Sequence, residues 1–341
     1  MKRLLVILFP LLFAACTLID DDLSVCGEEL LVNYQLQLRT ELSMQLRTEL
    51  YAETDTMVRQ ALEGWLSPVF TDKAKDIDLH FFSAGEDVIR HRIQDVINAN
   101  QTSYTINLPK EDYMHLGLAN IADNHQLSFL GREHSRTMEL ALPNKAMLES
   151  MNTGVFTARL PMSVDDKSAQ FDVFLYMVNA AVALVIDTTE CDSLVAMRGT
   201  LNDGACGFFV RDSVFDFSRV CAYQLVNVPI EHPAGAPASK RSRVQAEETI
   251  QPKVACLATV GMPTRDGMAW TLTFNSVLTN NRVTTTTLTV PDALQAGTLR
   301  VLRLRMTGNG GLEMIDDTKE VGVIVTLDWK NGGEHDIDLD D

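Results

Sequence analysis

Cys16 is the residue whose position most directly predicts a chemical reaction. It follows two alanines and an apolar run at residues 4–13, which begins directly after Lys2 and Arg3. A basic start, a short apolar run and small residues before a cleavage point are typical of a secretory signal peptide. A cysteine at that point predicts a lipoprotein signal, in which the chain is cut before Cys16 and the new N-terminal residue is acylated. The alternative is an ordinary signal peptide that happens to be cut before a cysteine.

Acylation of Cys16 would tether the chain to a membrane surface. The apolar run is about ten residues long and is too short to span a bilayer, which takes roughly 20 residues. Burial of an acyl chain contributes about 0.8 kcal/mol per methylene, and two or more chains hold a protein stably. A bacterial lipoprotein cysteine carries more than one chain, so we expect permanent attachment. Asp20, Asp21 and Asp22 follow the cysteine, and by themselves they are a solvated spacer.

The segment Arg132–Ser135 places acid, base and nucleophile types side by side, as Arg-Glu-His-Ser. Neighbouring residues on a strand point to opposite faces of the sheet, so these side chains are not expected to converge. A polar hairpin is the better interpretation. The seven histidines are scattered, and the sequence contains no nucleophile elbow, HExxH, GxGxxG or Walker motif. We therefore predict no catalytic residue, no enzymatic activity and no cofactor.

The cysteines other than Cys16 do not specify a metal site or a disulfide framework. They are Cys26, Cys191, Cys206, Cys221 and Cys256. Because their number is odd and their spacings are wide, at least one thiol is expected to be free. The absence of a Cys-x-x-Cys pair argues against structural zinc. Cys221 and Cys256 lie in apolar runs, where a cysteine usually acts as a small buried hydrophobic residue.

The acidic C-terminal tail is the second place where a metal could bind. Asp336, Asp338 and Asp340 alternate with Ile337 and Leu339, which fits an exposed edge strand or a set of carboxylate ligands for calcium. Calcium loops usually add a glycine turn and more varied oxygen ligands. The edge strand is therefore favoured, and no metal site is predicted.

The charge balance excludes one class of partner. The net charge is −17, and it becomes −19 once residues 1–15 are removed, because they contain two basic residues and no acidic ones. A surface this acidic repels nucleic acid phosphates and anionic lipid headgroups. No nucleic acid partner is predicted.

The elements that would position these groups are mainly strands. A chain of 341 residues suggests about two domains of roughly 150 residues each. Apolar and polar residues alternate in many short segments, as in half-buried strands, and strands separated by turns predict antiparallel β-sandwiches. Strands are expected at residues 30–38, 77–81, 88–90, 104–108, 114–121, 138–142, 194–199, 208–217, 222–229, 268–278, 282–290, 299–306 and 321–329.

A polar, turn-like stretch at residues 163–168 suggests a domain boundary. The expected order is a signal peptide at 1–15, a lipidated tether at 16–26, an N-terminal β-sandwich at 27–163 and a C-terminal β-sandwich at 164–341. A flexible loop is expected at about 231–252.

One helix and one long apolar run stand out from the strand pattern. The helix is expected after a cap at Thr54 or Asp55, with an apolar stripe over residues 57–66 and an end at Pro68. The apolar run Val173–Ile186 is fourteen residues long, which is too short for a membrane span. We interpret it as two buried strands that meet near Asn179.

Several short motifs resemble those of the fimbrial anchor lipoproteins of type V pili in Bacteroidales (FimB-like). The resemblance covers essentially the whole mature chain, and the C-terminal motif is the most specific. The motifs are the lipid-site cysteine followed by Asp22-Leu23-Ser24-Val25-Cys26, the strand Ile77–Phe82 with its turn, the tyrosine-led strand Tyr113–Asn120, and Val321–Trp329 with Gly332–Ile337.

The resemblance implies two tandem transthyretin-like Greek-key β-sandwich domains. The helix in the first domain and the duplicated Gln-Leu-Arg-Thr-Glu-Leu segment, at residues 37–42 and 45–50, are then local additions. The implied role is a non-catalytic anchor or accessory subunit that attaches a pilus to the outer membrane and limits its length. Pilin subunits would bind by strand addition, in which backbone hydrogen bonds supply the affinity. Asp20, Asp21 and Asp22 would act as the signal for export to the outer surface.

A second hypothesis is a surface lipoprotein that binds carbohydrate or another ligand. Such a protein would need a cluster of exposed aromatic side chains. Only three tryptophans are present, and Trp65 and Trp329 lie in patterned segments.

Overall fold

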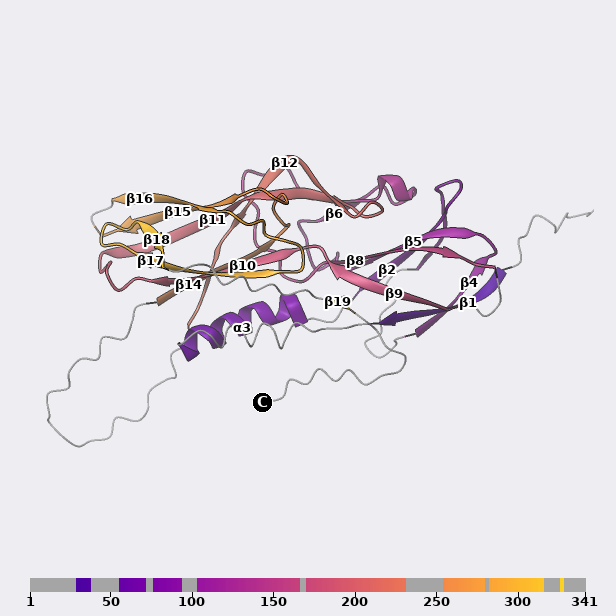
Figure 1. Cartoon of the computed structure of the whole chain (residues 1–341), viewed down its shortest axis with the longest axis horizontal. Coiled ribbons are helices and arrows are strands. Elements are labelled where there is room, and N and C mark those ends of the chain that lie inside the picture. The colour runs from indigo at the N-terminus through magenta and orange to yellow at the C-terminus, as the bar shows by residue number, and fades with distance from the viewer. Residues whose placement is uncertain are drawn as a thin grey trace, which may run out of the picture.

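The computed structural model describes residues 29–37, 55–71, 76–93, 103–165, 170–230, 254–279, 282–315 and 326–327. The predicted all-β class is confirmed, because most of these residues lie in strands and the described part contains one α-helix, α3 (Thr56–Thr71). The strands form three sheets. Figure 1 shows the first sheet at one end of an elongated molecule, the other two stacked at the opposite end, and α3 along the outside of the lower layer.

The first sheet has eight strands in the order β3-β2-β5-β8-β9-β1-β4, with β19 also paired to β9. All neighbours are antiparallel except β1 and β9, which run parallel. The bounds are β1 Glu29–Gln37, β2 Ile77–Ser83, β3 Ile89–Ile93, β4 Ser103–Pro109, β5 Asp112–Ala119, β8 Phe156–Ser163, β9 Gln170–Met177 and β19 Thr326–Leu327.

Strand β9 divides its pairing between different neighbours. Residues Gln170–Phe174 pair with β1, whereas the last three residues pair with β8 and β19. The predicted boundary between residues 163 and 164 thus falls between two neighbouring strands of one sheet. The division into two tandem transthyretin-like domains stays a prediction.

The other two sheets lie one above the other (Figure 1). One has the order β13-β14-β10-β17-β18, and the other has the order β16-β15-β11-β7-β6, with β12 also paired to β11. The bounds are β6 Ser128–Leu130, β7 Glu139–Ala141, β10 Ala180–Asp187, β11 Leu194–Phe209, β12 Val214–Gln224, β13 Val226–Val228, β14 Val254–Gly261, β15 Trp270–Leu278, β16 Val283–Val290, β17 Leu299–Met306 and β18 Leu312–Met314.

The apolar run Val173–Ile186 forms two strands, β9 and β10, as predicted, but only β10 is buried on both faces, because alternate side chains of β9 are exposed. Asn179 lies between them and fixes the turn, because its amide oxygen accepts a hydrogen bond from Val155 N at 3.1 Å and its amide nitrogen donates to Thr153 O at 2.9 Å. Every residue of β10 from Ala180 to Ile186 is buried, since the strand lies between two neighbours in the middle of its sheet.

The helix begins as predicted but does not end where predicted. Asp55 Oδ1 accepts a hydrogen bond from Met57 N at 2.9 Å, which is the geometry of an N-cap. Pro68 was expected to end the helix, yet α3 continues to Thr71. A proline removes one donor and strains the preceding turn. Here Val69 and Phe70 are buried in the core, and this burial favours helical continuation.

The strand predicted over residues 208–217 is wrong, because a turn lies inside it. Strand β11 ends at Phe209 and β12 begins at Val214, with Ser213 at a positive φ of 54°. Strand β11 is also longer than predicted, and irregular pairing between Leu201 and Gly204 and between Ala205 and Gly207 breaks its alternation. A bulge changes the face of the sheet on which the following side chains lie. The alternation of apolar and polar residues therefore does not predict the full length of such a strand.

Candidate functional site

The residues predicted to carry the lipid and the export signal, Cys16 and Asp20, Asp21 and Asp22, lie outside the described residues. So do Cys26, the duplicated segment beyond Gln37, the loop at 231–252 and the acidic tail. Their roles stay predictions. Among the described helices, none is long and apolar enough to cross a membrane.

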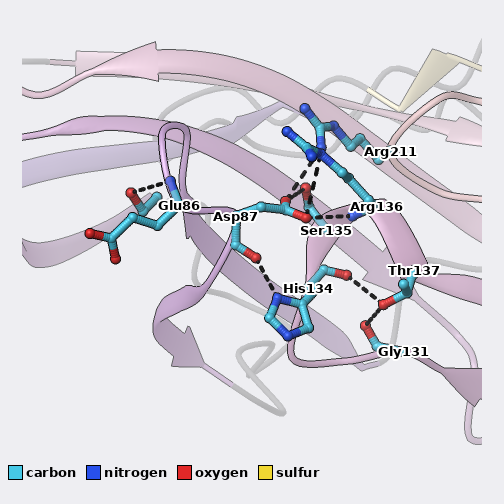
Figure 2. A network of polar contacts seen from close by, with 9 residues as sticks. Glu86, Asp87, Gly131, His134, Ser135, Arg136, Thr137 and Arg211 are labelled. Carbon is cyan, nitrogen blue, oxygen red and sulfur yellow. Dashed lines mark hydrogen bonds and ion pairs between the residues drawn. The ribbon is translucent and has the colours of Figure 1, made fainter.

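The Arg-Glu-His-Ser segment belongs to a polar cluster centred on Asp87 (Figure 2). Ser135 opens the short 3-10 helix η3 (Ser135–Thr137), and its hydroxyl donates to Asp87 Oδ1. The backbone N–H of Arg136 donates to Asp87 Oδ2 at 3.2 Å. His134 Nδ1 lies 2.9 Å from the backbone oxygen of Asp87, so this nitrogen carries the proton in the bond. We call Asp87, His134, Ser135, Arg136 and Arg211 the Asp87 cluster.

Two guanidinium groups complete the cluster. Arg211 Nη1, from the turn between β11 and β12, lies 3.4 Å from Asp87 Oδ1, and Arg136 Nε lies 3.7 Å from Asp87 Oδ2. Partial burial would raise the pKa of the Asp87 carboxyl, but the bonds from Ser135 and Arg136 N and the two guanidinium groups outweigh it, so the pKa is lowered. Asp87 itself has a φ of 58°, a left-handed conformation that aspartate adopts more readily than most residues.

The Asp87 cluster lacks the geometry of a catalytic triad. In a triad the nucleophile contacts the base and the base contacts the acid. Here the Ser135 hydroxyl binds the acid directly and the His134 ring binds a backbone carbonyl. The sequence argument assumed a strand, whereas a 3-10 helix begins at Ser135, and the prediction that neighbouring side chains would not converge fails for His134 and Ser135, which both bind Asp87.

The Asp87 cluster instead joins two parts of the molecule. Asp87 lies in the turn between β2 and β3 of the first sheet, and Arg211 lies in the turn between β11 and β12 of another sheet. Nearby, an apolar cluster combines Phe82 and Leu116 of the first sheet with Leu140 and Phe208 of the other. Sequence reasoning missed this contact because Asp87 and Arg211 are 124 residues apart and no local pattern links them.

Two histidines of the first sheet, His80 and His115, are fully buried and have no access to a substrate in solvent. Burial lowers the pKa of His80 to about 3, and the neighbouring side chains of Arg92, His115 and Arg132 lower it further because a protonated His80 would be repelled by their protonated forms. Burial lowers the pKa of His115 to about 4, against the hydrogen bond between its Nδ1 and His80 O, which raises it. Within the described part, neither ring nitrogen of His80 has a hydrogen-bond partner. Both rings are therefore neutral at physiological pH.

The cysteines of the described chain, Cys191, Cys206, Cys221 and Cys256, are all buried thiols. This confirms the prediction of burial for Cys221 and Cys256. Cys206 Sγ donates to Asp216 Oδ2 at 3.0 Å, and Arg219 Nη1 lies 3.1 Å from Cys221 Sγ. No group of three histidine, cysteine or acidic side chains among the described residues could hold a metal ion.

The strands at the ends of the sheet paths each have an open edge where another chain could add a strand. They are β3 and β4 in the first sheet, β13 and β18 in the second, and β16 and β6 in the third. Strand β16 is the longest of these at eight residues, and its side chains alternate between exposed and partly buried. An edge strand of this length presents a row of backbone donors and acceptors.

Comparisons of the sequence with known protein families and with curated proteins give no match. Solved structures do share the fold. The fimbrial anchor protein Mfa2 from Porphyromonas gingivalis is 11% identical, with 88% of this chain and 99% of that chain covered and a TM-score of 0.51. A candidate adhesin from Bacteroides thetaiotaomicron is 10% identical, with 87% and 99% covered and a TM-score of 0.53.

A candidate polysaccharide-binding protein from the same species is 10% identical, with 85% of this chain and 98% of that chain covered and a TM-score of 0.51. At these identities the likeness shows the fold. The chain is therefore similar in fold, over most of its length, to fimbrial and adhesin proteins of Bacteroidales, in agreement with the family that its short motifs resemble.

Proposed function

We propose that this protein is a cell-surface lipoprotein that serves as a fimbrial anchor or accessory subunit, attaches a pilus to the outer membrane and limits its length. The observation that carries the proposal is the fold shared with the fimbrial anchor Mfa2 over 88% of this chain. The lipoprotein signal that ends at Cys16 adds independent support from the sequence. In this role the protein is a structural subunit and not an enzyme.

The proposed attachment begins at the acylated Cys16. Twelve residues lie between Cys16 and Glu29, the first residue of β1, so thirteen residue-to-residue steps join the two. An extended chain spans at most about 3.3–3.6 Å per residue, so this tether reaches no more than roughly 45 Å from the membrane. Asp20, Asp21 and Asp22 lie within it, where we propose that they direct export to the outer face.

The lipid site is tested with a pair of cysteine variants. Cys16→Ser should release the protein from the outer-membrane fraction, because the acyl chains can no longer be attached. Cys26→Ser changes the other cysteine near the N-terminus and should leave the protein membrane-bound. A Cys16→Ser protein that stays in the membrane fraction after a carbonate wash would overturn this part.

The export signal is tested separately. Replacing Asp20, Asp21 and Asp22 together with alanine should leave the protein in the membrane fraction and protect it from protease added to intact cells. Replacing them with glutamate keeps the charge and should preserve digestion. Equal digestion of the alanine variant and the wild type would contradict the proposed signal.

The fimbrial role is tested by recovering the membrane-bound protein and identifying what comes with it. A ladder of pilin subunits is expected, whereas recovery without pilin would overturn the role. We propose β16 as the edge that pairs with a pilin strand. A photocrosslinker at the exposed position Thr287 in β16 should capture pilin, and the same group at Val220 in β12, which is 59% exposed, should not. Cells that lack the protein should carry longer or detached fibres.

A further inference from the structure

Strand β9 presents two aromatic side chains to solvent. Of the aromatic side chains whose exposure the structure describes, Phe174 and Tyr176 are the most exposed, at 38% and 54%. They are two residues apart, and alternate residues of a strand lie on the same face. The strand rises 3.2–3.4 Å per residue, so the two positions are about 7 Å apart along it. They form one aromatic surface, which we call the β9 platform.

The opposite face of β9 holds the platform rigidly. Val173, Leu175 and Met177 alternate with the two aromatic residues and are buried at 1%, 0% and 4% exposure. The backbone is paired as well, since Phe174 lies opposite Gln37 and Tyr176 lies opposite Thr157. A surface fixed in this way loses little conformational entropy when a ligand binds.

The chemistry of the surroundings distinguishes between ligand classes. Asp172 continues the same face of β9 and is exposed, whereas Thr157, which pairs with Tyr176, is buried. A groove for an apolar peptide would continue into aliphatic side chains, whereas this surface continues into the exposed carboxylate of Asp172. Two aromatic rings next to a polar side chain can bind a ligand that has one apolar face and a polar rim. The rings contact the apolar face, and the polar side chain hydrogen-bonds to the rim.

We infer that the β9 platform binds a neutral polysaccharide. The C–H faces of successive sugar rings would stack on Phe174 and Tyr176, and sugar hydroxyls would donate to the Asp172 carboxylate. An acidic glycan would be repelled by Asp172 and by the net charge of −17. A carbohydrate-binding protein needs a cluster of exposed aromatic side chains. The three tryptophans do not provide such a cluster, whereas Phe174 and Tyr176 do. This site does not depend on the anchoring function.

The test is affinity electrophoresis of the full-length protein in detergent through gels that contain neutral α-glucan, β-glucan, mannan or galactan. At least one polymer should retard the wild-type protein. Phe174→Ala and Tyr176→Ala should each weaken the retardation at least tenfold in apparent Kd, and Asp172→Asn should weaken it less. Tyr176→Phe keeps the ring and should retain most of the binding.

Controls separate loss of binding from loss of fold. Val220→Ala removes an exposed apolar side chain from β12 and should bind as the wild type does. Each variant should also keep the thermal unfolding midpoint of the wild type, because the changed side chains are exposed. The inference is overturned if none of the four polymers retards the wild type, or if the Phe174→Ala/Tyr176→Ala double variant binds normally. It is also overturned if the double substitution abolishes self-association of the protein and leaves polymer binding unchanged, because the β9 platform would then bind a second copy of the chain. None of these results bears on membrane attachment or pilin capture.

Discussion

The first sheet and the two stacked sheets differ in what they bury. The first sheet encloses the imidazoles of His80 and His115, both fully buried. The stacked sheets enclose Trp270, Phe274 and the apolar strand β10. Burying a neutral imidazole makes folding depend on pH, whereas apolar burial does not. The comparison shows that the two buried histidines make the first sheet sensitive to acid, whereas burial of Trp270, Phe274 and the apolar residues of β10 contributes stability that does not depend on pH.

The largest expected effect is at the apolar end. Trp270→Ala removes a fully buried ring and the hydrogen bond that its Nε1 donates to Asp292 O at 2.7 Å. Such truncations cost about 3–5 kcal/mol. Urea unfolding at pH 7.5 and pH 5.5 should give the same loss at both values. If the loss in the free energy of unfolding differed strongly between the two pH values, the assignment of acid sensitivity to the first sheet would be contradicted.

Asp87→Asn tests the contact between the two ends. The amide is neutral and cannot accept from both Ser135 and Arg136 N with full strength, while Arg211 and Arg136 lose their ion pair. Removing one partner of buried polar groups costs about 1–3 kcal/mol. Hydrogen exchange should increase at residues 135–138 and in the β11–β12 turn.

The matched control for this change is Asp212→Asn, which alters an exposed neighbour of Arg211 in the same turn. It should leave exchange unchanged. Because the folded pKa of Asp87 is lowered, its contribution to stability is present above the unfolded pKa near 4 and is lost as the pH falls through the folded value. The Asn variant should lose less stability than the wild type in that range.

His80→Leu should reduce the acid sensitivity of the first sheet. Its folded pKa of about 3 is below the unfolded value of 6.5, so the wild-type protein is stabilised above pH 6.5 and loses stability as the pH falls below it. At pH 5 this loss is about 1–2 kcal/mol per histidine. Urea midpoints between pH 7 and pH 5 should fall less for His80→Leu than for the wild type.

His125→Gln is the control for the histidine effect, because the His125 side chain is 64% exposed. Its pH profile should match that of the wild type. Part of the acid sensitivity should remain in His80→Leu, since His115 is unchanged. An unchanged profile in His80→Leu would place the acid-sensitive group elsewhere.

The smallest effect on stability is expected at the β9 platform. Phe174→Ala and Tyr176→Ala change exposed side chains, and substitutions of this kind usually stay within about 0.5 kcal/mol. Unfolding midpoints should therefore stay close to wild type while binding is lost. A large destabilisation would show that the rings serve the core of the first sheet.

The sequence predicted elements whose signals are local. The alternation around Val32 located β1, Asp55 capped α3, and Asn179 divided β9 from β10. The prediction from sequence failed where tertiary contacts determine the structure. At Pro68, for example, the helix continues because the residues after the proline are buried in the core. The prediction also failed at bulges, which shift the alternation along β11.

The candidate sites were harder to predict than the fold. The Asp87 cluster depends on a contact between Asp87 and Arg211 that spans 124 residues. The β9 platform was missed because Phe174 and Tyr176 lie in a nearly continuous apolar run, which favours burial on both faces. Only the structure shows that one face of β9 is left open to solvent.

The position of β1 has a mechanical consequence. It lies between β4 and β9, opposite seven residues of β4 and five residues of β9. In the proposed anchor, tension on a fibre would enter the folded protein at Glu29 and run along β1. Hydrogen bonds of a sheet lie across the strand direction, so a pull along β1 loads all of them in shear at once instead of peeling them one at a time. The strand next to the tether is thus the one best placed to resist extraction.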